Sequence, residues 1–419
     1  MDCFKDVKIC FLADKHDLYD DRIYWKMAVP MKKLGAEVHY YLIGPQSDEG
    51  RTPEGIEYRM WALKAYSKNT FVNFAIKRVN PLNNYEKIYE ACVELKADVY
   101  HFHDLWLNRI APRLKSLPHR PVVFYDAREP YAEDYRSLHD SGRLSKMLVG
   151  IFASWVDRWE KKKASNYDLV IANEPKVRQE FANAIGEERA VVLYNYLDRT
   201  LFAGDLKGVT PSAETAGFSD NPQFTYHYKR YDLIYCGLLT QKRGAWKLLE
   251  AIRGLKPGIP KLKVLLLGKI DPPGLRQEMQ SFIRRHDLNH TIEIKGQVPY
   301  EQVGKYYRAS RIGLLLWQPV SSLKIKMPIK LFEYMAFGLP VVGSNFGHIA
   351  DLIEKESCGI TVNPENPEEV AEAIESLMRQ EKMYKALRNN GIEAAREKYN
   401  WQREFDNLCN HYKKALDER

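Results

Sequence analysis

Residues 327–344 read MPIKLFEYMAFGLPVVGS, and this stretch decides the fold of the second half of the chain. Pro328 suits the first turn of a helix, where its missing N–H is not needed, and a glycine follows where the helix would end. The apolar run Pro340–Val342 then predicts a buried strand. Lys330 and Glu333 lie three residues apart, so they share one face near the positive amino end of the helix.

This helix start could bind a phosphate-bearing ligand. Backbone N–H groups and Lys330 would bind a diphosphate, and Glu333 would accept hydrogen bonds from two ribose hydroxyls. The residues alone equally allow an ordinary helix with one solvent-facing salt bridge between these two side chains. Both interpretations stay open at this point.

Short runs rich in Val, Ile, Leu and Tyr alternate with helical patterns on both sides of this stretch. Because these runs are apolar on both faces, they predict strands buried in parallel sheets with helices on each side. The expected strands are residues 7–13, 37–43, 56–61, 98–103, 121–127, 168–172 and 190–194, then 232–236, 262–267, 291–294, 312–316, 340–343 and 359–362. The pattern pauses at about residues 203–230, which read as a linker. We therefore expect an α/β chain with two Rossmann-like, doubly wound domains facing across a cleft, and ligands at the carboxyl ends of the strands.

Composition narrows the classes of partner. The chain has 419 residues and a net charge of +8, which suits phosphate-bearing ligands, nucleic acid or an anionic membrane surface. Without zinc-finger spacing, an RNP-like motif or a basic tail, we expect no nucleic acid. The six cysteines are far apart, the start is charged rather than signal-like, and no apolar run reaches the roughly 18–20 residues of a membrane span. These features predict a cytoplasmic protein with reduced thiols.

The stretch PIKLFEYMAFGLPVVGS resembles the signature of family-4-type (group 1) retaining glycosyltransferases of the GT-B fold, in the branch that builds capsule, lipopolysaccharide and exopolysaccharide. Weaker matches follow in the family's order, among them DVYHFHDLW, VVFYDAREPY and LIYCGLLTQKRGAWKLLEAI. The resemblance implies a retaining, metal-independent hexosyltransferase that moves a sugar from a UDP- or GDP-linked donor to a hydroxyl of a glycan or lipid-linked glycan. It implies an acceptor domain at residues 1–200, a donor domain at 201–400, and a last helix at 401–419 that packs back on the first domain.

The resemblance also implies the donor site. Gly237 would let the backbone approach the diphosphate, Arg243 would neutralise the leaving group, and Glu333 would bind the ribose. The implied donor-binding set is Gly237, Lys242, Arg243, Gly244, Lys269, Val298, Lys330, Leu331 and Glu333. No D-x-D motif is present, so we expect no metal and no cofactor besides the nucleotide sugar.

Two positions depart from the family pattern. Ile325 stands where the family's first glutamate would contact the donor sugar, and Arg128 stands where a histidine is usual. The resemblance implies catalytic roles for Arg128, Arg243 and Lys330, although Arg128 could instead pair with Asp126 or Glu129. These departures leave a non-catalytic nucleotide-sugar-binding scaffold as an alternative, beside a sugar-nucleotide epimerase. The chain lacks the G-x-G-x-x-G of a dinucleotide oxidoreductase.

The first domain offers acceptor candidates. Arg22 stands where the resemblance places the family's acceptor loop, and His103 and Asp104 stand at the end of the expected strand 98–103, so these three residues would bind the acceptor. Each has a simpler interpretation, because Arg22 could be an ordinary helix start and Asp104 a helix cap. One His-x-His pair, His101 and His103, defines no metal ligand set.

Residues 143–163 suggest a contact of another kind. Leu144, Leu148, Ile151, Trp155 and Trp159 recur at helical spacing among lysines and arginines. Such a helix could lie in an anionic membrane interface, which would place the protein on the inner face of the cytoplasmic membrane. It could equally pack its apolar face on the sheet of the first domain.

Overall fold

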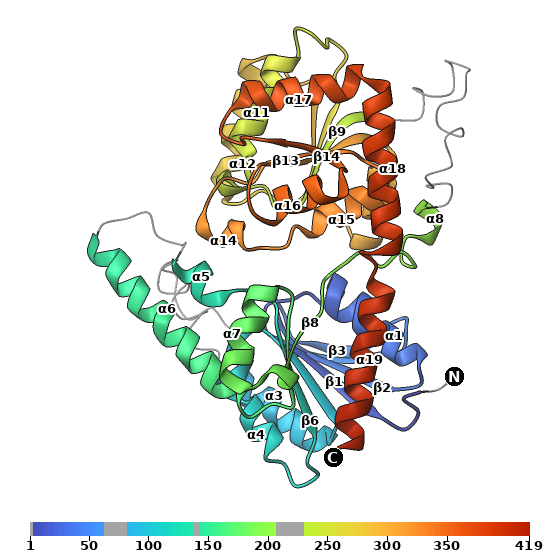
Figure 1. Cartoon of the computed structure of the whole chain (residues 1–419). Helices are drawn as coiled ribbons and strands as arrows, with labels where there is room; N and C mark the ends of the chain where they lie inside the picture. The colour runs from blue at the N-terminus through green and yellow to red at the C-terminus, as the bar shows by residue number, and fades with distance from the viewer. Residues whose placement is uncertain (1–2, 63–81, 137–142, 207–229) are drawn as a thin grey trace. The chain divides into compact units, whose positions relative to one another are not determined.

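The computed structural model describes residues 3–62, 82–136, 143–206 and 230–419. The chain divides into two compact units (Figure 1): unit 1 contains Met1–Asn195 and Gln402–Arg419, and unit 2 contains Tyr196–Trp401. The first crossing between units lies near the predicted boundary at residue 200, and the second is at the start of the predicted last helix. Most of the predicted linker, residues 207–229, lies outside the described residues.

Unit 1 is built on a sheet of order β3-β4-β2-β1-β5-β6-β7-β8, parallel except for the β3–β4 pair. Its strands are β1 Lys8–Ala13, β2 Glu37–Gly44, β3 Asp48–Arg51, β4 Glu57–Ala62, β5 Val99–His103, β6 Val122–Ala127, β7 Leu169–Ala172 and β8 Ala190–Val192. The predicted strands are all present. The strand that was not predicted, β3, is an exposed polar edge strand, so it lacks the apolar pattern that indicates the others.

The helices of unit 1 cover both faces of this sheet (Figure 1). They are η1 Asp21–Ala28, α1 Val29–Lys33, α3 Leu82–Leu95, η2 Leu105–Arg109, α4 Ala111–Lys115, α5 Tyr131–Arg136, α6 Arg143–Ala164, α7 Pro175–Ile185, η3 Glu187–Arg189 and α19 Trp401–Asp417. The helix η1, directly after β1, is a π-helix, a form that often marks functional sites. Apart from its first residue, α19 belongs to unit 1.

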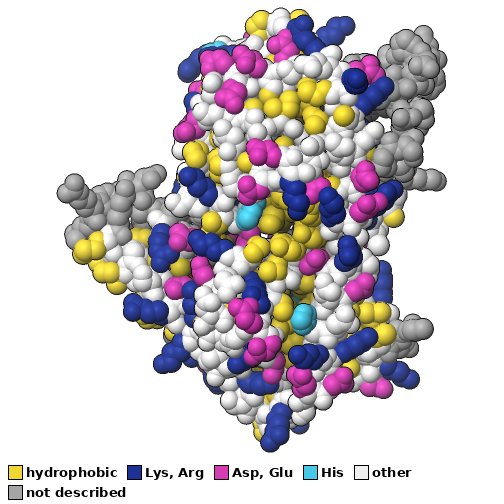
Figure 2. Space-filling model, in the orientation of Figure 1, with side chains coloured by type: hydrophobic (Ala, Val, Ile, Leu, Met, Phe, Trp, Pro, Cys, Tyr) yellow, Lys and Arg dark blue, Asp and Glu magenta, His cyan; other side chains and the backbone are white. Residues whose placement is uncertain are grey.

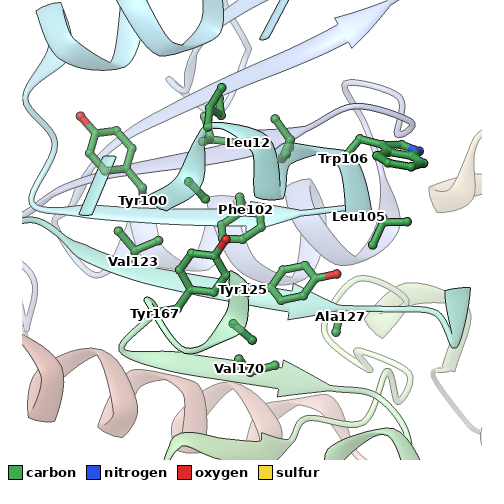
Figure 3. Packing of buried hydrophobic residues seen from close by; sticks show 14 of the residues in the cluster. Leu12, Tyr100, Phe102, Leu105, Trp106, Val123, Tyr125, Ala127, Tyr167 and Val170 are labelled. Carbon is green, nitrogen blue, oxygen red and sulfur yellow. The ribbon is translucent and has the colours of Figure 1, made fainter. Parts of the chain in front are cut away.

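Aromatic rings fill much of the core of unit 1 (Figure 3). Phe102 of β5 stacks on Tyr125 of β6, with ring centroids 4.7 Å apart, and Tyr167 meets Phe102 edge-on at 5.0 Å. On the other face Tyr412 of α19 packs edge-on against Phe124 at 5.0 Å. These ring pairs join neighbouring strands on one face of the sheet and hold the last helix against the other face.

Unit 2 has a wholly parallel sheet of order β11-β10-β9-β12-β13-β14. Its strands are β9 Tyr231–Cys236, β10 Val264–Leu267, β11 Ile292–Gly296, β12 Ser310–Leu315, β13 Val341–Ser344 and β14 Gly359–Val362. Its helices are α8 Ala203–Leu206, η4 Gln241–Arg243, α11 Ala245–Leu255, α12 Pro273–Arg285, η5 Tyr300–Gln302, α13 Val303–Arg308, α14 Ser321–Lys324, α15 Ile329–Ala336, α16 Gly347–Glu356, α17 Pro367–Arg379 and α18 Glu381–Glu397. This is the doubly wound strand order of nucleotide-binding sheets, and α15 and β13 are the helix and strand predicted from residues 327–344.

Among the described residues, no helix has both the length and the apolar character needed to cross a bilayer. The six cysteines form no disulfide, and all but Cys3 are buried.

One buried carboxyl group makes the stability of unit 1 depend on pH. Glu160 of α6 is buried and accepts a hydrogen bond from the Tyr125 hydroxyl. Burial raises the pKa of Glu160 from 4.5 to about 8. The stabilisation from the protonated group is therefore complete below pH 4.5 and is lost as the pH rises through about 8.

We expect Glu160→Gln to unfold at about the same free energy as wild type near pH 4.5 and to be more stable above pH 8. The amide keeps an oxygen that can accept from Tyr125 but cannot ionise, so the difference should reach the order of 1–4 kcal/mol. Urea unfolding across this pH range measures it. The exposed control Glu188→Gln should show no such trend, and a pH-independent difference for Glu160→Gln would contradict the assignment.

Candidate functional site

Strand order reverses once in each sheet, beside its first strand. In unit 1 the reversal falls between β1 and β5, and in unit 2 between β9 and β12. Ligands of open α/β sheets bind outside the carboxyl ends of the strands at such switch points, because no crossover covers them there. Residues that follow these four strands are therefore the first candidates in each unit.

In unit 2, glycines shape the turn after β9. Gly237 has a φ of +135°, and a Cβ on the neighbouring Gly268 would lie 1.9 Å from the Gly237 carbonyl oxygen. Gly244 has a φ of +82°, and a Cβ there would lie 2.0 Å from the carbonyl oxygen of Leu316. These close approaches require glycine at Gly268 and Gly244, and the positive φ of Gly237 is a conformation that glycine adopts without strain. The predicted Gly237 and Gly244 therefore shape the turn itself.

Arg243 is held at this switch point. Its backbone N–H donates to Thr240 Oγ1 over 3.1 Å, which caps the turn η4. Its half-buried guanidinium lies 5.5 Å from the ring centroid of Trp317, just after β12. Burial raises the pKa of Tyr235 to about 12 against the opposing effect of Arg243, which places the guanidinium beside this phenol as well. A cation thus lies next to the start of the eleven-residue helix α11, an arrangement that favours anions.

Glu333 of α15 is completely buried, and three side chains donate to it. Its Oε2 accepts from Lys330 Nζ over 2.7 Å and from the Tyr307 hydroxyl, while Oε1 accepts from the Tyr300 hydroxyl over 3.4 Å. The salt bridge between Lys330 and Glu333 that the sequence also allowed is present, but the prediction that it faces solvent is wrong for Glu333. Tyr307 lies on α13, and no sequence spacing connects it with Glu333, so sequence analysis missed it.

α15 is tied to the central strand of the sheet. The backbone N–H of Cys236, the last residue of β9, donates to the Tyr334 hydroxyl over 2.9 Å. A Cβ on Gly313 of β12 would lie 2.4 Å from the Tyr334 ring, so glycine makes room for this phenol. These contacts hold Lys330 and Glu333 at the switch point.

The other predicted donor residues occupy the same edge with different exposure. Lys269 follows β10 and is exposed, and Val298 follows β11 and is half-buried. The Lys242 carbonyl accepts from the Gln318 N–H over 2.8 Å, which joins the turns after β9 and β12. Leu331 differs, because its side chain is buried in the core and its N–H donates to the Pro328 carbonyl. In this structure Leu331 positions α15 instead of facing the edge.

In unit 1, Asp104 joins the two strand ends at the switch point. Its Oδ2 accepts from the backbone N–H groups of Asp14 and Lys15, over 3.0 and 3.2 Å. Its Oδ1 lies 3.1 Å from His16 Nε2. Asp104 has a φ of +79° and caps no helix with its side chain, so the predicted cap is wrong. Such backbone strain in a non-glycine residue is concentrated at functional sites.

Arg128 belongs to the same group of charges. Its Nη1 lies 3.1 Å from Asp20 Oδ1, and Asp20 Oδ2 lies 3.0 Å from His16 Nδ1. Burial and Arg128 lower the pKa of His16, but Asp104 and Asp20 outweigh them and raise it to about 9. Burial, helped by Asp104, raises the pKa of Asp14 to about 7. Cations at His16 and Arg128 therefore lie among carboxyl groups at this edge.

Arg22 and His103 lie deeper. Arg22 is 1% exposed, with Nε 2.9 Å from Asp126 Oδ2 and Nη2 3.0 Å from the Leu193 carbonyl oxygen. Asp126, which the sequence offered to Arg128, is thus paired with Arg22. His103 is 0% exposed, and burial holds its pKa well below the usual value. As placed here both support the strand ends, and their contact with an acceptor stays a prediction.

His101, His103 and Asp126 come together although the sequence gave no ligand set, because Asp126 lies on the neighbouring strand. Their nearest nitrogen and oxygen atoms lie within 4.8 Å of one another. However, Arg22 already pairs with Asp126, and the His101 Nδ1 is 2.7 Å from the Tyr412 hydroxyl. A divalent ion would add two uncompensated charges to a fully buried group, so this cluster fits a structural network better than a metal centre.

The His16–Asp104 pair predicts a measurable titration. In wild type the ring of His16 should titrate near pH 9, and in Asp104→Asn its pKa should fall by a unit or more because the neighbouring charge is gone. Since the folded pKa is raised, the pair stabilises the fold fully below pH 6.5 and loses this contribution as the pH rises through about 9. NMR titration, with the His16 signal assigned through His16→Gln, measures the shift. An unchanged pKa in Asp104→Asn would contradict the pairing.

Two doubly wound parallel sheets are the architecture of the GT-B fold, and solved glycosyltransferase structures align with nearly the whole length of the chain, at TM-scores of 0.70 and 0.66. Residues 220–394 match the family model described as glycosyl transferases group 1. This match covers less than half of the chain, and together with the relatives below it supports a glycosyltransferase activity. The predicted GT-B fold is therefore confirmed, and the predicted resemblance to group 1 glycosyltransferases is confirmed over residues 220–394.

Relatives of known sequence or structure are distant. An uncharacterized glycosyltransferase of Methanocaldococcus jannaschii is 22% identical over 416 residues, 95% of this chain and 97% of that protein. The amylovoran biosynthesis glycosyltransferase AmsK of Erwinia amylovora is 30% identical over 141 residues, 33% of each chain. The Anabaena protein HepE, solved in complex with UDP-glucose, is 15% identical with a TM-score of 0.64 and covers 97% of this chain and 99% of its own.

Proposed function

We propose that this glycosyltransferase is a retaining, metal-independent hexosyltransferase of surface polysaccharide biosynthesis. It would take its sugar from a nucleoside-diphosphate donor, UDP- or GDP-linked, and needs no further cofactor. The observation that carries the proposal is the placement of Arg243, Lys330 and the buried Glu333 at the switch point of unit 2. HepE with its UDP-glucose supports the donor class, and the role of AmsK in amylovoran biosynthesis supports the product class.

In the proposed donor complex, the diphosphate binds Arg243 and the amino end of α11. Lys330 adds a second cation, 26% exposed on its side chain. Glu333 Oε1 holds only a long hydrogen bond, 3.4 Å from Tyr300, so it retains lone pairs for a ribose hydroxyl. The turn after β11, with Val298, borders the base, and Lys269 after β10 extends the basic edge.

The proposed reaction needs no protein nucleophile. The acceptor hydroxyl attacks the anomeric carbon from the face that the diphosphate leaves, so the new bond has the configuration of the old one. The bond from the anomeric carbon to the phosphate oxygen breaks, the bond to the acceptor oxygen forms, and the departing phosphate takes the hydroxyl proton. Negative charge grows on the diphosphate in the transition state, where Arg243 and Lys330 stabilise it.

We assign acceptor binding to unit 1. Asp104 and His16 at the β1–β5 switch point would orient an acceptor hydroxyl, and Arg128 would supply positive charge to a phosphate or carboxylate near the reacting groups. Arg22 and His103 then contribute by fixing Asp126 and the strand ends. The acceptor is a glycan or a lipid-linked glycan, and a lipid-linked one would bring the protein to the inner face of the cytoplasmic membrane.

A thermal-shift series with nucleoside diphosphates and their sugars, in EDTA, tests the donor site. A ligand at about 100 times its dissociation constant adds about 2.7 kcal/mol of stability, and we expect UDP or GDP and the matching sugar to raise the melting temperature. Arg243→Ala and Glu333→Gln should abolish most of this shift. Glu333→Gln keeps the size of the buried side chain, so the variant should still fold.

Matched controls are available on α12 of the same unit. Arg276→Ala and Glu278→Gln change exposed residues of the same types and should leave the shift intact. If no nucleotide raises the melting temperature either in EDTA or with a divalent ion, or if the two site variants respond like wild type, the donor site is wrong. A shift that needs a divalent ion would contradict metal independence.

An activity assay distinguishes a glycosyltransferase from a sugar-nucleotide epimerase and from a non-catalytic scaffold. With donor and acceptor in EDTA, wild type should form a glycoside whose anomeric configuration, measured by proton NMR, matches the donor. Arg243→Ala should lower kcat by about 10²–10³ because a contact to the leaving group is lost. Interconversion of the donor without acceptor would indicate an epimerase, and nucleotide binding without any turnover would indicate a scaffold.

A further inference from the structure

The helix α6 of unit 1 has two apolar faces, and only one of them is used inside the protein. Ala153 and Val156 are fully buried in the core of unit 1, and Trp159 packs partly against it. The Trp159 ring centroid lies 5.7 Å from that of Trp106 in η2. This face corresponds to the packed helix that the sequence allowed.

The second face is exposed. Met147, Leu148, Ile151 and Trp155 are 56%, 58%, 59% and 46% exposed. Elsewhere in the described part of the chain, the exposed large hydrophobic side chains are Tyr19 and Val93. Figure 2 shows hydrophobic side chains gathered over α6, with lysines and arginines beside them. Such clustering marks an interaction surface.

The structure corrects the membership of the predicted stripe. Trp159 belongs to the packed face, and Met147 joins the exposed one. The side chain of Leu144 lies outside the described residues. The packed face confirms one of the two interpretations that the sequence left open, and the exposed face leaves the membrane contact a prediction.

Towards the carboxyl end of α6, the exposed face carries positively charged side chains. Arg158 and Lys162 follow Trp155 by three and seven residues, so they extend the same face, and both are exposed. Lys161 differs, because it pairs with Asp157 over 2.7 Å and with Glu180 over 3.3 Å. The surface therefore has an apolar half with a tryptophan and a cationic half.

We propose that this face of α6 docks on an anionic lipid bilayer. Apolar side chains would enter the boundary between headgroups and acyl chains, Trp155 would lie at that boundary, and Arg158 and Lys162 would meet lipid phosphates. Charge complementarity favours the bilayer over a second copy of this chain, because the cations need an acidic partner and the chain carries a net charge of +8. The docking itself does not depend on the proposed function. Only its purpose, which is to bring the protein to a lipid-linked acceptor, rests on that proposal.

Flotation of the full chain with vesicles, without any nucleotide sugar, tests the docking. Vesicles of equal parts phosphatidylglycerol and phosphatidylcholine should carry wild type upward, and pure phosphatidylcholine should carry much less. The double variant Ile151→Ser with Trp155→Ser should lower the partition coefficient at least about tenfold, because its apolar contact is removed. Arg158→Gln with Lys162→Gln should lower it to a similar extent, and raised salt should have little further effect on that variant.

Matched controls remove the same chemistry elsewhere in unit 1. Val93→Ser removes an exposed apolar side chain of α3, and Lys5→Gln with Lys176→Gln removes two exposed charges. Both controls should float like wild type. Because every residue changed in this experiment lies outside the proposed donor site, the nucleotide thermal shift should be the same in all variants, which also shows that they fold.

Three results would overturn the docking proposal. Wild type that fails to float with anionic vesicles excludes it, and so does equal flotation of wild type and both α6 variants. A concentration-dependent dimer in analytical ultracentrifugation, lost in Ile151→Ser with Trp155→Ser, would assign the face to a second copy instead. Failure of the nucleotide shift alone would refute the donor site and leave the docking intact.

Discussion

The rest of the structure depends on one constraint, which is how the strand ends are stabilised where strand order reverses beside the first strand of each sheet. At that point backbone groups at the strand ends have no crossover helix above them and need other partners. Unit 1 uses a carboxylate, Asp104, which accepts from two N–H groups of the turn after β1. Unit 2 uses close backbone packing, in which Gly244 of the turn after β9 approaches the Leu316 carbonyl after β12. Asp104 places a negative charge at the sheet edge of unit 1, whereas the glycines of unit 2 leave space at the edge for charged side chains.

The two edges therefore differ in electrostatics as well as in shape. In unit 2, the Glu333 carboxylate is buried and accepts hydrogen bonds from one ammonium group and two phenol hydroxyls. Unit 1 instead gathers His16 and Arg128 with the carboxyl groups of Asp20 and Asp104. Under the proposed function, the edge of unit 2 would bind the diphosphate of the donor and the edge of unit 1 would bind the acceptor.

Sequence patterns predicted the parts of the fold that follow from local rules, and missed those that depend on contacts across the chain. Buried parallel strands are apolar on both faces, so their runs are visible, whereas the polar edge strand β3 is not. The Lys330–Glu333 pair follows from helical spacing, but Tyr307 reaches the same carboxylate from α13. The pairing of Arg128 with Asp20 and of Arg22 with Asp126 depends on which strand ends become neighbours. Helical spacing likewise could not divide the apolar residues of α6 between two faces.

The path of the chain makes unit 2 an insertion within unit 1. The segment Gln402–Arg419 returns to unit 1, where Tyr412 lies beside His101 and Phe124. On the ribosome, unit 2 is therefore fully synthesised while unit 1 still lacks a helix of its core, although β1 is made first. Domains fold as units once their residues are available, so the domain that begins the chain is the last to be completed. Premature termination within the last helix would therefore leave unit 2 complete and unit 1 without part of its structure.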